Sequence, residues 1–324
     1  MPPPKIDKLR PGIYVPTVAF FTAPDQDKID VDATKAHVRR LVQAAVAGVV
    51  VQGSSGEAVH LDRQERNAVT RATRCALDGT AVALVAGCGA QSTRETVTLC
   101  RDAAESGADF ALVLPPSYYH AAGGLTMDLV VRHFRRVADE SPLPVLVYNF
   151  PAVCSGLDLD SDVLSSLARH PNIVGVKLTC GNTGKLARVV ASTAADDGFR
   201  VFGGSADFTL QTLSVGGHGV IAGLANVAPA ACVEVMRLWQ EGKVDDAVRI
   251  QAVVATADWV VINGGFVSVK AALETYFRYG GLPRMPCRLL EGDALDAQMA
   301  GLVELVELER KLAVYSSSSS LLPQ

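Results

Sequence analysis

Short runs of apolar, mostly β-branched residues recur along this chain at intervals of roughly thirty residues, and a segment with helical periodicity follows each run. Several runs, such as residues 81–86 and 110–114, are apolar throughout, as expected of parallel strands covered on both faces. We predict eight strands, over residues 13–18, 48–52, 81–86, 110–114, 144–148, 173–178, 200–202 and 219–221.

Eight strands alternating with helices predict an α/β chain folded as a closed (β/α)8 TIM barrel. The competing architecture is an open doubly wound sheet. That fold usually has a G-x-G-x-x-G turn after its first strand, and no such turn follows Val18. The pattern therefore favours the barrel.

Helical segments fill the spaces between these strands and continue beyond the last one. Asp32, Asp62, Ser92 and Asp160 are placed to cap helices over residues 32–47, 62–77, 92–106 and 160–170. After residue 221 the pattern is wholly helical, and we predict helices over residues 229–241, 245–261, 270–279 and 293–312. We therefore expect a catalytic barrel over residues 1–241, a C-terminal helical extension over 242–315 and a flexible serine-rich tail over 316–324.

Charge and cysteine content exclude several classes of protein. The net charge is -4 with no run of Lys or Arg, so we expect no nucleic-acid partner. The seven cysteines are scattered without a C-x-x-C, which indicates reduced thiols. Residues 1–10 lack the apolar core of a signal peptide, and no stretch approaches the ~18 uninterrupted apolar residues of a membrane span. We expect a cytoplasmic protein with no membrane partner.

The active site of a barrel enzyme is built from the carboxyl ends of the strands and the loops that follow them. After the second predicted strand comes Gly53-Ser54-Ser55-Gly56-Glu57. Its two hydroxyls and several unhindered backbone N–H groups suit a carboxylate, which accepts several hydrogen bonds at once. The alternative is a tight turn that needs glycine for its backbone alone.

Three of the seven tyrosines also fall on this predicted rim. Tyr118 and Tyr119 follow the fourth strand, and Tyr148 ends the fifth. A single tyrosine at a barrel mouth is often only packing, with its hydroxyl in water. Three on one rim favour a functional role.

Lys177 lies near the end of the sixth predicted strand, after four apolar residues. Strand alternation places it on the same face as Ile173 and Gly175, so we expect it to lie at least partly inside the barrel. A lysine is rarely buried without a partner or a function. A neutral amine attacks carbonyls, and burial disfavours the ammonium form. The alternative is a structural lysine paired with Glu57 or another carboxylate.

Metal and phosphate chemistry find little support in the sequence. We expect His37, His133 and His170 on solvated helix faces, and His120 and His218 on rim loops where they can contact substrate. None of these has metal-ligand spacing. The glycines at 203–204 and 216–219 have no Lys or Arg close by in the sequence to neutralise a phosphate. We therefore predict no metal, no cofactor and a substrate without phosphate.

Five motifs follow one another along the chain. They are GSSGE at 53–57, SYY at 117–119, YNFP at 148–151, GVK at 175–177 and GGHGVIAGLANV at 216–227. In this order and spacing, the set resembles the dihydrodipicolinate synthase / N-acetylneuraminate lyase family of Schiff-base aldolases, from about residue 12 to the final helices. Residues 49–57 and 279–286 look closer to 4-hydroxy-2-oxoglutarate aldolases and fungal 2-keto-3-deoxy-acid aldolases.

The resemblance implies a homotetramer without a metal, in which a lysine forms an imine with pyruvate or another small 2-oxo acid. Lys177 matches the imine-forming lysine, and Tyr148 matches the general acid/base. Ser55 and Tyr119 match members of a hydroxyl relay that connects Tyr148 to solvent. The substrate-binding positions implied or expected are Gly53, Ser54, Ser55, Thr179 and Ile221.

Two departures from the family pattern bear on the substrate. The usual GTTGE loop is GSSGE here, which keeps both hydroxyls. Residues 151–156 lack the arginine that binds the aldehyde's carboxylate in the synthases, and Val153 and Cys154 cannot replace bidentate guanidinium recognition. We expect these two residues, with Tyr118 and His120, to hold the aldehyde half of the substrate.

The predicted function is a class I lyase that breaks or forms a C–C bond of a 4-hydroxy-2-oxo acid. Three alternatives stay open. One is a synthase that condenses pyruvate with aspartate semialdehyde. The second is a sialic acid lyase, which is less favoured because no recogniser for a long polyol chain is visible. The third is an inactive family member that serves as a binding protein.

Overall fold

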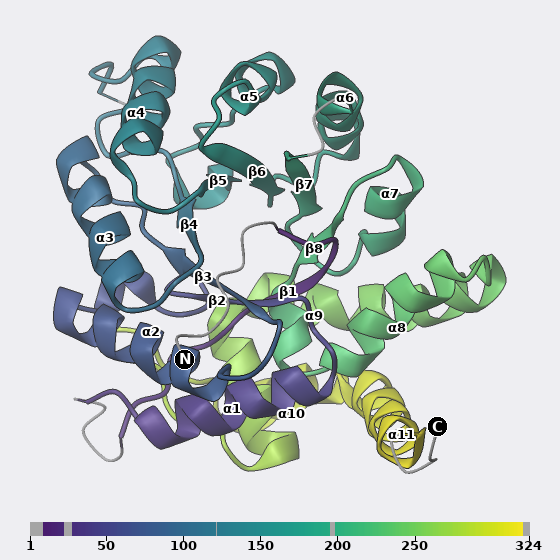
Figure 1. The fold of residues 1–324 in the computed structure, drawn as a ribbon. Coiled ribbons are helices and arrows are strands. Elements are labelled where there is room, and N and C mark those ends of the chain that lie inside the picture. Colours follow the sequence, from purple (N-terminus) through teal and green to yellow (C-terminus); the bar gives the residue numbers. More distant parts are fainter. Residues whose placement is uncertain (1–8, 23–27, 121, 195–197, 320–324) are drawn as a thin grey trace.

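A computed structural model describes residues 9–22, 28–120, 122–194 and 198–319 of the chain. Its strands are all parallel and form a closed barrel in sequence order, with β1 paired to β8, which confirms the predicted TIM barrel (Figure 1). Each predicted strand overlaps an observed one. The strands are β1 Gly12–Pro16, β2 Gly48–Val51, β3 Ala83–Gly87, β4 Phe110–Val113, β5 Val145–Asn149, β6 Ile173–Leu178, β7 Arg200–Gly203 and β8 Gly219–Ile221.

Helices surround this ring of strands (Figure 1). Those between strands are α1 Val31–Gln43, η1 Ala58–His60, α2 Arg63–Ala76, α3 Thr93–Glu105, α4 Met127–Glu140, η2 Pro151–Val153, α5 Ser161–Ala168, α6 Thr183–Thr193 and α7 Thr209–Ser214. After β8 come η3 Gly223–Asn226, α8 Pro229–Gln240, α9 Val244–Phe277, α10 Gly292–Ala300 and α11 Val303–Ser319.

Side-chain caps fix where several helices begin. Asp62, Ser92 and Asp160 accept hydrogen bonds from N–H groups in the first turns of α2, α3 and α5, as predicted. The cap assigned to Asp32 is wrong. Asp30 caps α1 by accepting from the N–H of Ala33 at 2.8 Å, and Asp32 lies in the first turn instead.

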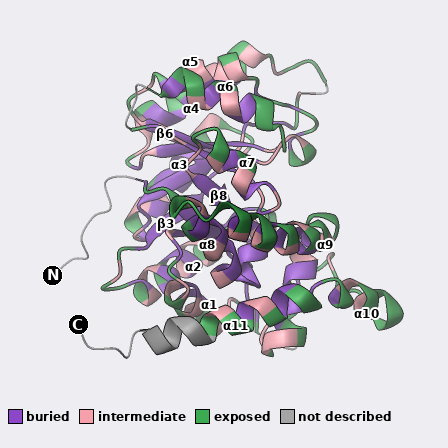
Figure 2. Cartoon of the chain, turned by 90° about the vertical axis from the view of Figure 1, so that its right-hand side faces the viewer, coloured by how far each residue is buried: buried purple, intermediate pink, exposed green. Residues whose placement is uncertain are grey.

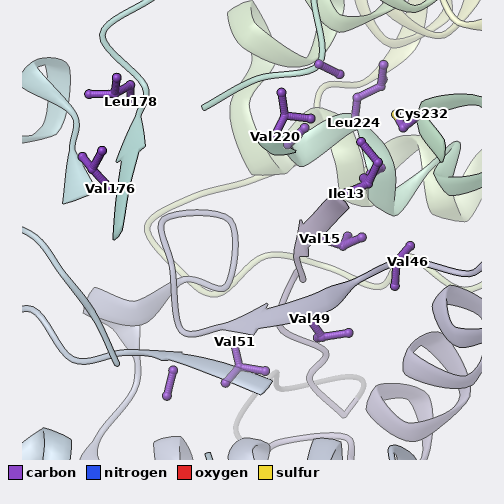
Figure 3. Close-up of a cluster of buried hydrophobic side chains, with 14 of the residues drawn as sticks. Ile13, Val15, Val46, Val49, Val51, Val176, Leu178, Val220, Leu224 and Cys232 are labelled. Carbon is purple, nitrogen blue, oxygen red and sulfur yellow. The ribbon is translucent and has the colours of Figure 1, made fainter. Parts of the chain in front are cut away.

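Two apolar layers account for the strand pattern, and the strands are the most deeply buried part of the chain (Figure 2). An outer layer joins strands to helices. It includes Val49 and Val51 of β2 and Val176 and Leu178 of β6 (Figure 3). An inner layer fills the barrel itself, and its members include Tyr14, Val50, Val85, Leu112, Leu146, Tyr148, Phe202 and Ile221.

The C-terminal helices gather on one side of the barrel, where α9 and α11 pack against α8 and α10 packs against α9. The predicted helices over 245–261 and 270–279 are largely two parts of α9, which kinks at Gly265 (φ 60°, ψ −155°). Helix α11 continues to Ser319, so residues 316–319 of the predicted flexible tail are helical. Residues 320–324 lie outside the described part, and the boundaries at 241 and 315 stay predictions.

By length and composition alone, α9 could cross a membrane, because one 18-residue window of it has a mean hydropathy of 1.5. Core helices of soluble proteins pass the same test. The buried polar residues Gln251, Asp258 and Lys270 of α9 bond other parts of the chain.

Candidate active site

Lys177 and Tyr148 meet inside the barrel because they pair across neighbouring strands, β6 and β5. The Nζ of Lys177 lies 4.2 Å from the centroid of the Tyr148 ring. Both side chains are nearly enclosed, with exposed fractions of 4% and 3%. The structure therefore brings together the two residues that the sequence singles out for imine chemistry.

The two faces of β6 explain why Lys177 points inward. Val176 and Leu178 belong to the outer layer, which leaves Lys177 and Gly175 on the inner face. The expectation that Ile173 shares this face is wrong, since Ile173 packs in the outer layer. A register shift between Val145 and Leu146 opposite this stretch, where Val145 pairs with Ile173 and Leu146 with Gly175, breaks the simple alternation.

The Lys177 amine is not held by an acid. Within the described residues, no hydrogen bond or ion pair reaches its Nζ, which instead lies over the face of the Tyr148 ring. The alternative pairing with Glu57 is wrong, because Lys270 Nζ lies 2.9 Å from Glu57 Oε1. Among the described residues, no acidic group therefore competes for this amine, and its reaction with a carbonyl group stays a prediction.

The loop 53–57 follows β2 at the carboxyl end of the barrel and offers several unused donors. Ser54 is exposed and Ser55 is half-buried. In the part of the chain that the structure describes, their backbone N–H groups and hydroxyls have no hydrogen-bond partner. Four donors in two consecutive residues match the needs of a carboxylate.

Backbone geometry fixes the shape of this loop. Gln52 and Glu57 both have left-handed backbone, with φ values of 53° and 50°. A Cβ atom added to Gly56 would lie 2.9 Å from the nitrogen of Gln52, so only glycine fits there without movement. The glycine is needed for close packing, and the donors of Ser54 and Ser55 lie beside it. That this loop binds a carboxylate stays a prediction.

Two further predicted substrate-binding residues lie at strand ends on the same side of the barrel. The Thr179 hydroxyl is buried and has no partner among the described residues. Ile221 ends β8 and packs in the inner layer with Tyr148. Next to that strand end, the Oγ of Ser55 is 3.8 Å from where a Cβ on Gly223 would lie. Loop 53–57 and the end of β8 are thus neighbours.

Tyr118 and Tyr119 do not enter the barrel within this single chain. They are 74% and 63% exposed and contact each other edge to face, with ring centroids 5.1 Å apart. Of the three tyrosines predicted on the rim, Tyr148 alone lies beside Lys177. The assignment of Tyr119 to a relay stays a prediction.

The residues expected to hold the aldehyde half divide into two groups. Val153 is about half exposed on η2, and His120 is partly buried, with its Nδ1 3.4 Å from the carbonyl of Leu125. Cys154 is buried in the outer layer, with its Sγ 3.9 Å from the carbonyl oxygen of Pro115, and burial raises the pKa of its thiol to about 11. Cys154 therefore packs against the protein interior, and its thiol contacts the segment after β4.

Several histidine predictions are wrong. His37 and His133 are buried, not solvated, and burial lowers the pKa of His37 to about 3 and that of His133 to about 4. His218 precedes β8, so it lies at the amino end of the barrel, away from the rim. There it contacts Arg200 at 3.3 Å, and the glycines around it are no rim loop. Within the described residues, no cluster of three or more His, Cys, Asp or Glu could hold a metal ion.

Lys270 and Arg284 were missed by the sequence reasoning, although they contact the loop 53–57. Lys270 binds Glu57, and the backbone N–H of Arg284 donates to Glu57 Oε2 at 2.9 Å. Lys270 carries the same signal as Lys177, namely a lysine within an apolar run. The distance along the chain, more than 200 residues, hides the partner.

Comparisons with known proteins identify the family of this chain. Residues 11–302 match the family described as the Dihydrodipicolinate synthetase family. A relative from Emericella nidulans named as a mitochondrial 4-hydroxy-2-oxoglutarate aldolase is 54% identical, over 94% of this chain and 97% of the relative. The L-threo-3-deoxy-hexylosonate aldolase of Hypocrea jecorina is 46% identical, over 93% and 98%.

A solved structure supports the same grouping. A prophage protein of the dihydrodipicolinic acid synthase family from E. coli K12, solved in complex with pyruvate, superposes with a TM-score of 0.84. It is 29% identical and is matched over 91% of this chain and 98% of its own.

The cytoplasmic location expected from the sequence is contradicted by the Emericella relative, whose name points to the mitochondrion. The unpaired cysteines argue only against an oxidising compartment and do not distinguish one reducing compartment from another.

The family match covers most of the chain, and both relatives described above are aldolases by name. This chain belongs to the dihydrodipicolinate synthetase family and is one of its carbon–carbon lyases, the aldolases.

Proposed function

We propose that this protein is a class I aldolase that uses Lys177 to form an imine with a 4-hydroxy-2-oxo acid and releases pyruvate and an aldehyde. The observation that carries the proposal is the Lys177 amine, enclosed in the barrel, free of any acidic partner among the described residues and 4.2 Å from the Tyr148 ring.

The chemistry follows from those positions. The neutral Lys177 amine adds to the C2 carbonyl, and Tyr148 protonates the departing hydroxyl so that water leaves and an iminium forms. The C4 hydroxyl then gives its proton to Tyr148, which lost one in the preceding step, and the C3–C4 bond breaks. Its electron pair moves into the iminium, which gives a neutral enamine and frees the aldehyde. Protonation at C3 and hydrolysis release pyruvate and restore the amine.

The remaining predicted residues have supporting roles in this scheme. The N–H groups and hydroxyls of Ser54 and Ser55, with Gly53 beside them, bind the carboxylate of the 2-oxo acid. Thr179, two residues after Lys177, offers a buried hydroxyl that has no partner in the described part of the chain. Tyr119 joins a proton relay through Ser55 to Tyr148, and the backbone of Ile221 contacts substrate.

The substrate class is supported by relatives and by one absence in the sequence. The names of the relatives specify 4-hydroxy-2-oxoglutarate and a 3-deoxy-hexulosonate, and the E. coli structure contains pyruvate. Residues 151–156 have no arginine for the carboxylate of aspartate semialdehyde. We therefore favour aldol cleavage over lysine-pathway condensation.

We also infer that the enzyme is a homotetramer located in mitochondria. The exposure of Tyr118 and Tyr119 supports assembly, because a second chain packed on this rim would cover two aromatic rings that are costly to leave in water. The name of the Emericella relative supports the location. Analytical ultracentrifugation and cell fractionation test the two inferences separately.

Borohydride reduction in the presence of pyruvate, followed by peptide mass mapping, tests the proposed function. We expect a mass increase on the peptide that contains Lys177 and none in a Lys177→Ala variant. A folded wild-type protein that is not modified, or is modified on another lysine, overturns the assignment. Screening 4-hydroxy-2-oxoglutarate and C6 2-keto-3-deoxy acids for pyruvate release then identifies the substrate, and a coupled assay with aspartate semialdehyde tests the synthase alternative.

A further inference from the structure

The loop 53–57 is held in place from the far end of the chain. Glu57 closes the loop, and its side chain is fully buried beside the equally buried side chain of Lys270 on α9. Lys270 Nζ donates to Glu57 Oε1 at 2.9 Å and to the carbonyl oxygen of Leu282 at 2.7 Å. Burial lowers the pKa of Lys270, while the charge of Glu57 opposes that shift.

The second oxygen of Glu57 is bound as well. Its Oε2 accepts from the backbone N–H of Arg284 at 2.9 Å and lies 3.0 Å from His60 Nδ1. The guanidinium of Arg284 in turn donates to both carboxylate oxygens of Glu65 on α2, at 2.7 and 2.8 Å. Arg284, in the segment after α9, therefore binds both the loop 53–57 and helix α2.

An aromatic ring completes this arrangement. Lys270 Nζ lies 4.8 Å and the Arg284 guanidinium carbon 4.3 Å from the centroid of the Phe21 ring. The face of an aromatic ring stabilises a nearby cation. Lys270 pairs with Glu57, and Arg284 pairs with Glu65.

We propose that Glu57 and Lys270 are positioning residues, which hold the free donors of Ser54 and Ser55 in the geometry that binds the substrate carboxylate. The C-terminal extension is then part of the active site and not an appendix. This inference rests on the proposed function of loop 53–57. The donors of the loop strengthen binding only if its backbone is already ordered before the substrate arrives.

Breaking the pair by changing one partner should be more harmful than removing both charges. Lys270→Met leaves the Glu57 carboxylate buried without its cation, and Glu57→Gln leaves the ammonium without its anion. The double variant E57Q/K270M has neither buried charge. Glu309→Gln is the matched control. Glu309 is also buried in the C-terminal extension, but it binds the N–H groups of Ala230 and Ala231 on α8 and does not contact the loop.

Steady-state kinetics on the full-length protein separate positioning from stability. We expect E57Q and K270M to raise KM for the 2-oxo acid at least tenfold with a smaller change in kcat, and to keep borohydride trapping at saturating pyruvate. The double variant should have a KM between those of the single variants and that of wild type. E309Q should lower Tm with no change in KM. Wild-type KM in E57Q or K270M, with lowered Tm, overturns the inference and leaves a structural role only.

Hydrogen exchange gives a readout that does not require activity. The amides of residues 53–57 should exchange faster in E57Q than in wild type or in E309Q. If K270M fails to fold, E57Q carries both tests, because glutamine keeps the size of the side chain. Absence of trapping in the wild-type protein overturns the proposed function, whereas normal trapping with unchanged KM and unchanged exchange in E57Q overturns the positioning role alone.

Discussion

Tyr148 and Lys177 are partners in the register of β5 and β6, and this pairing sets the Lys177 amine 4.2 Å from the centroid of the tyrosine ring. Strand pairing is among the most rigid relationships in a barrel, so neither side chain needs a loop to reach the other. In the proposed reaction, Lys177 is the nucleophile and Tyr148 is the proton donor.

Replacing Tyr148 with phenylalanine should slow imine formation without removing the amine that attacks the carbonyl. We expect kcat to fall by about 10²–10⁴-fold, the usual contribution of a positioned acid/base. Borohydride should still trap some imine on Lys177. Tyr276→Phe is the control, since the Tyr276 hydroxyl bonds the carbonyl of Met299 in the C-terminal helices. Wild-type turnover in Y148F would reject the proton-donor role of Tyr148.

Gly204 should not tolerate alanine. A Cβ there would lie 2.1 Å from the Thr179 hydroxyl and 2.4 Å from the Thr179 Cα, so the end of β6 would have to move. We expect Gly204→Ala to lower Tm and cut turnover by tenfold or more, because ~1 Å of misplacement in an active site is costly. Gly184→Ala in α6, where a Cβ makes ordinary contacts from 3.4 Å, should be neutral or stabilising by up to about 1 kcal/mol.

Asp258 should make stability fall as pH rises. Burial, and next the charge of Asp207, raise the pKa of Asp258 from 3.8 to about 7. Between these values the folded chain holds a proton that the unfolded chain has released, so the free energy of unfolding decreases with increasing pH.

Urea unfolding of wild type and Asp258→Asn from pH 4 to 8 checks this sign. The stability of wild type relative to the variant should decline across pH 4–7, by an amount on the order of a few kcal/mol, and level off above. A difference that stays constant or grows with pH contradicts the burial of a protonated Asp258.

His37 should act in the opposite direction on acidification. Burial lowers its pKa from 6.5 to about 3, and its ring nitrogens face Tyr279 and Asn226 at 3.0 Å. Below pH 6.5, His37 binds a proton in the unfolded chain but stays neutral in the folded chain. The contribution of neutral His37 to the free energy of unfolding is therefore lost as pH falls towards 3.

Comparing wild type with His37→Gln isolates that contribution. From pH 7 to pH 5, wild type should lose about 2 kcal/mol more than the variant, as expected for a group that titrates only when unfolded. Parallel curves for the two proteins would mean that His37 is already accessible to protons in the folded state.

The sequence by itself determined the barrel and singled out Lys177 as the candidate for imine formation. Strand and helix periodicities are local signals, and eight alternations leave few folds other than a closed barrel. Lys177 stood out because a charge within an apolar strand is unusual, and the rule that barrel sites lie at the carboxyl ends of strands located Ser54 and Ser55 as well.

The tertiary structure alone decided which groups face each other. A register shift beside Ile173 changed a face that alternation predicted otherwise. His37 is buried among Phe20, Asn226 and Tyr279, which come from other parts of the chain. Glu57 pairs with Lys270, which lies more than 200 residues away in the sequence. Among the described residues, Lys177 therefore has no acidic partner. Periodicity reports which side of an element is apolar. It holds no information about which distant side chain meets it, because such contacts depend on how the closed barrel and its C-terminal helices pack in space.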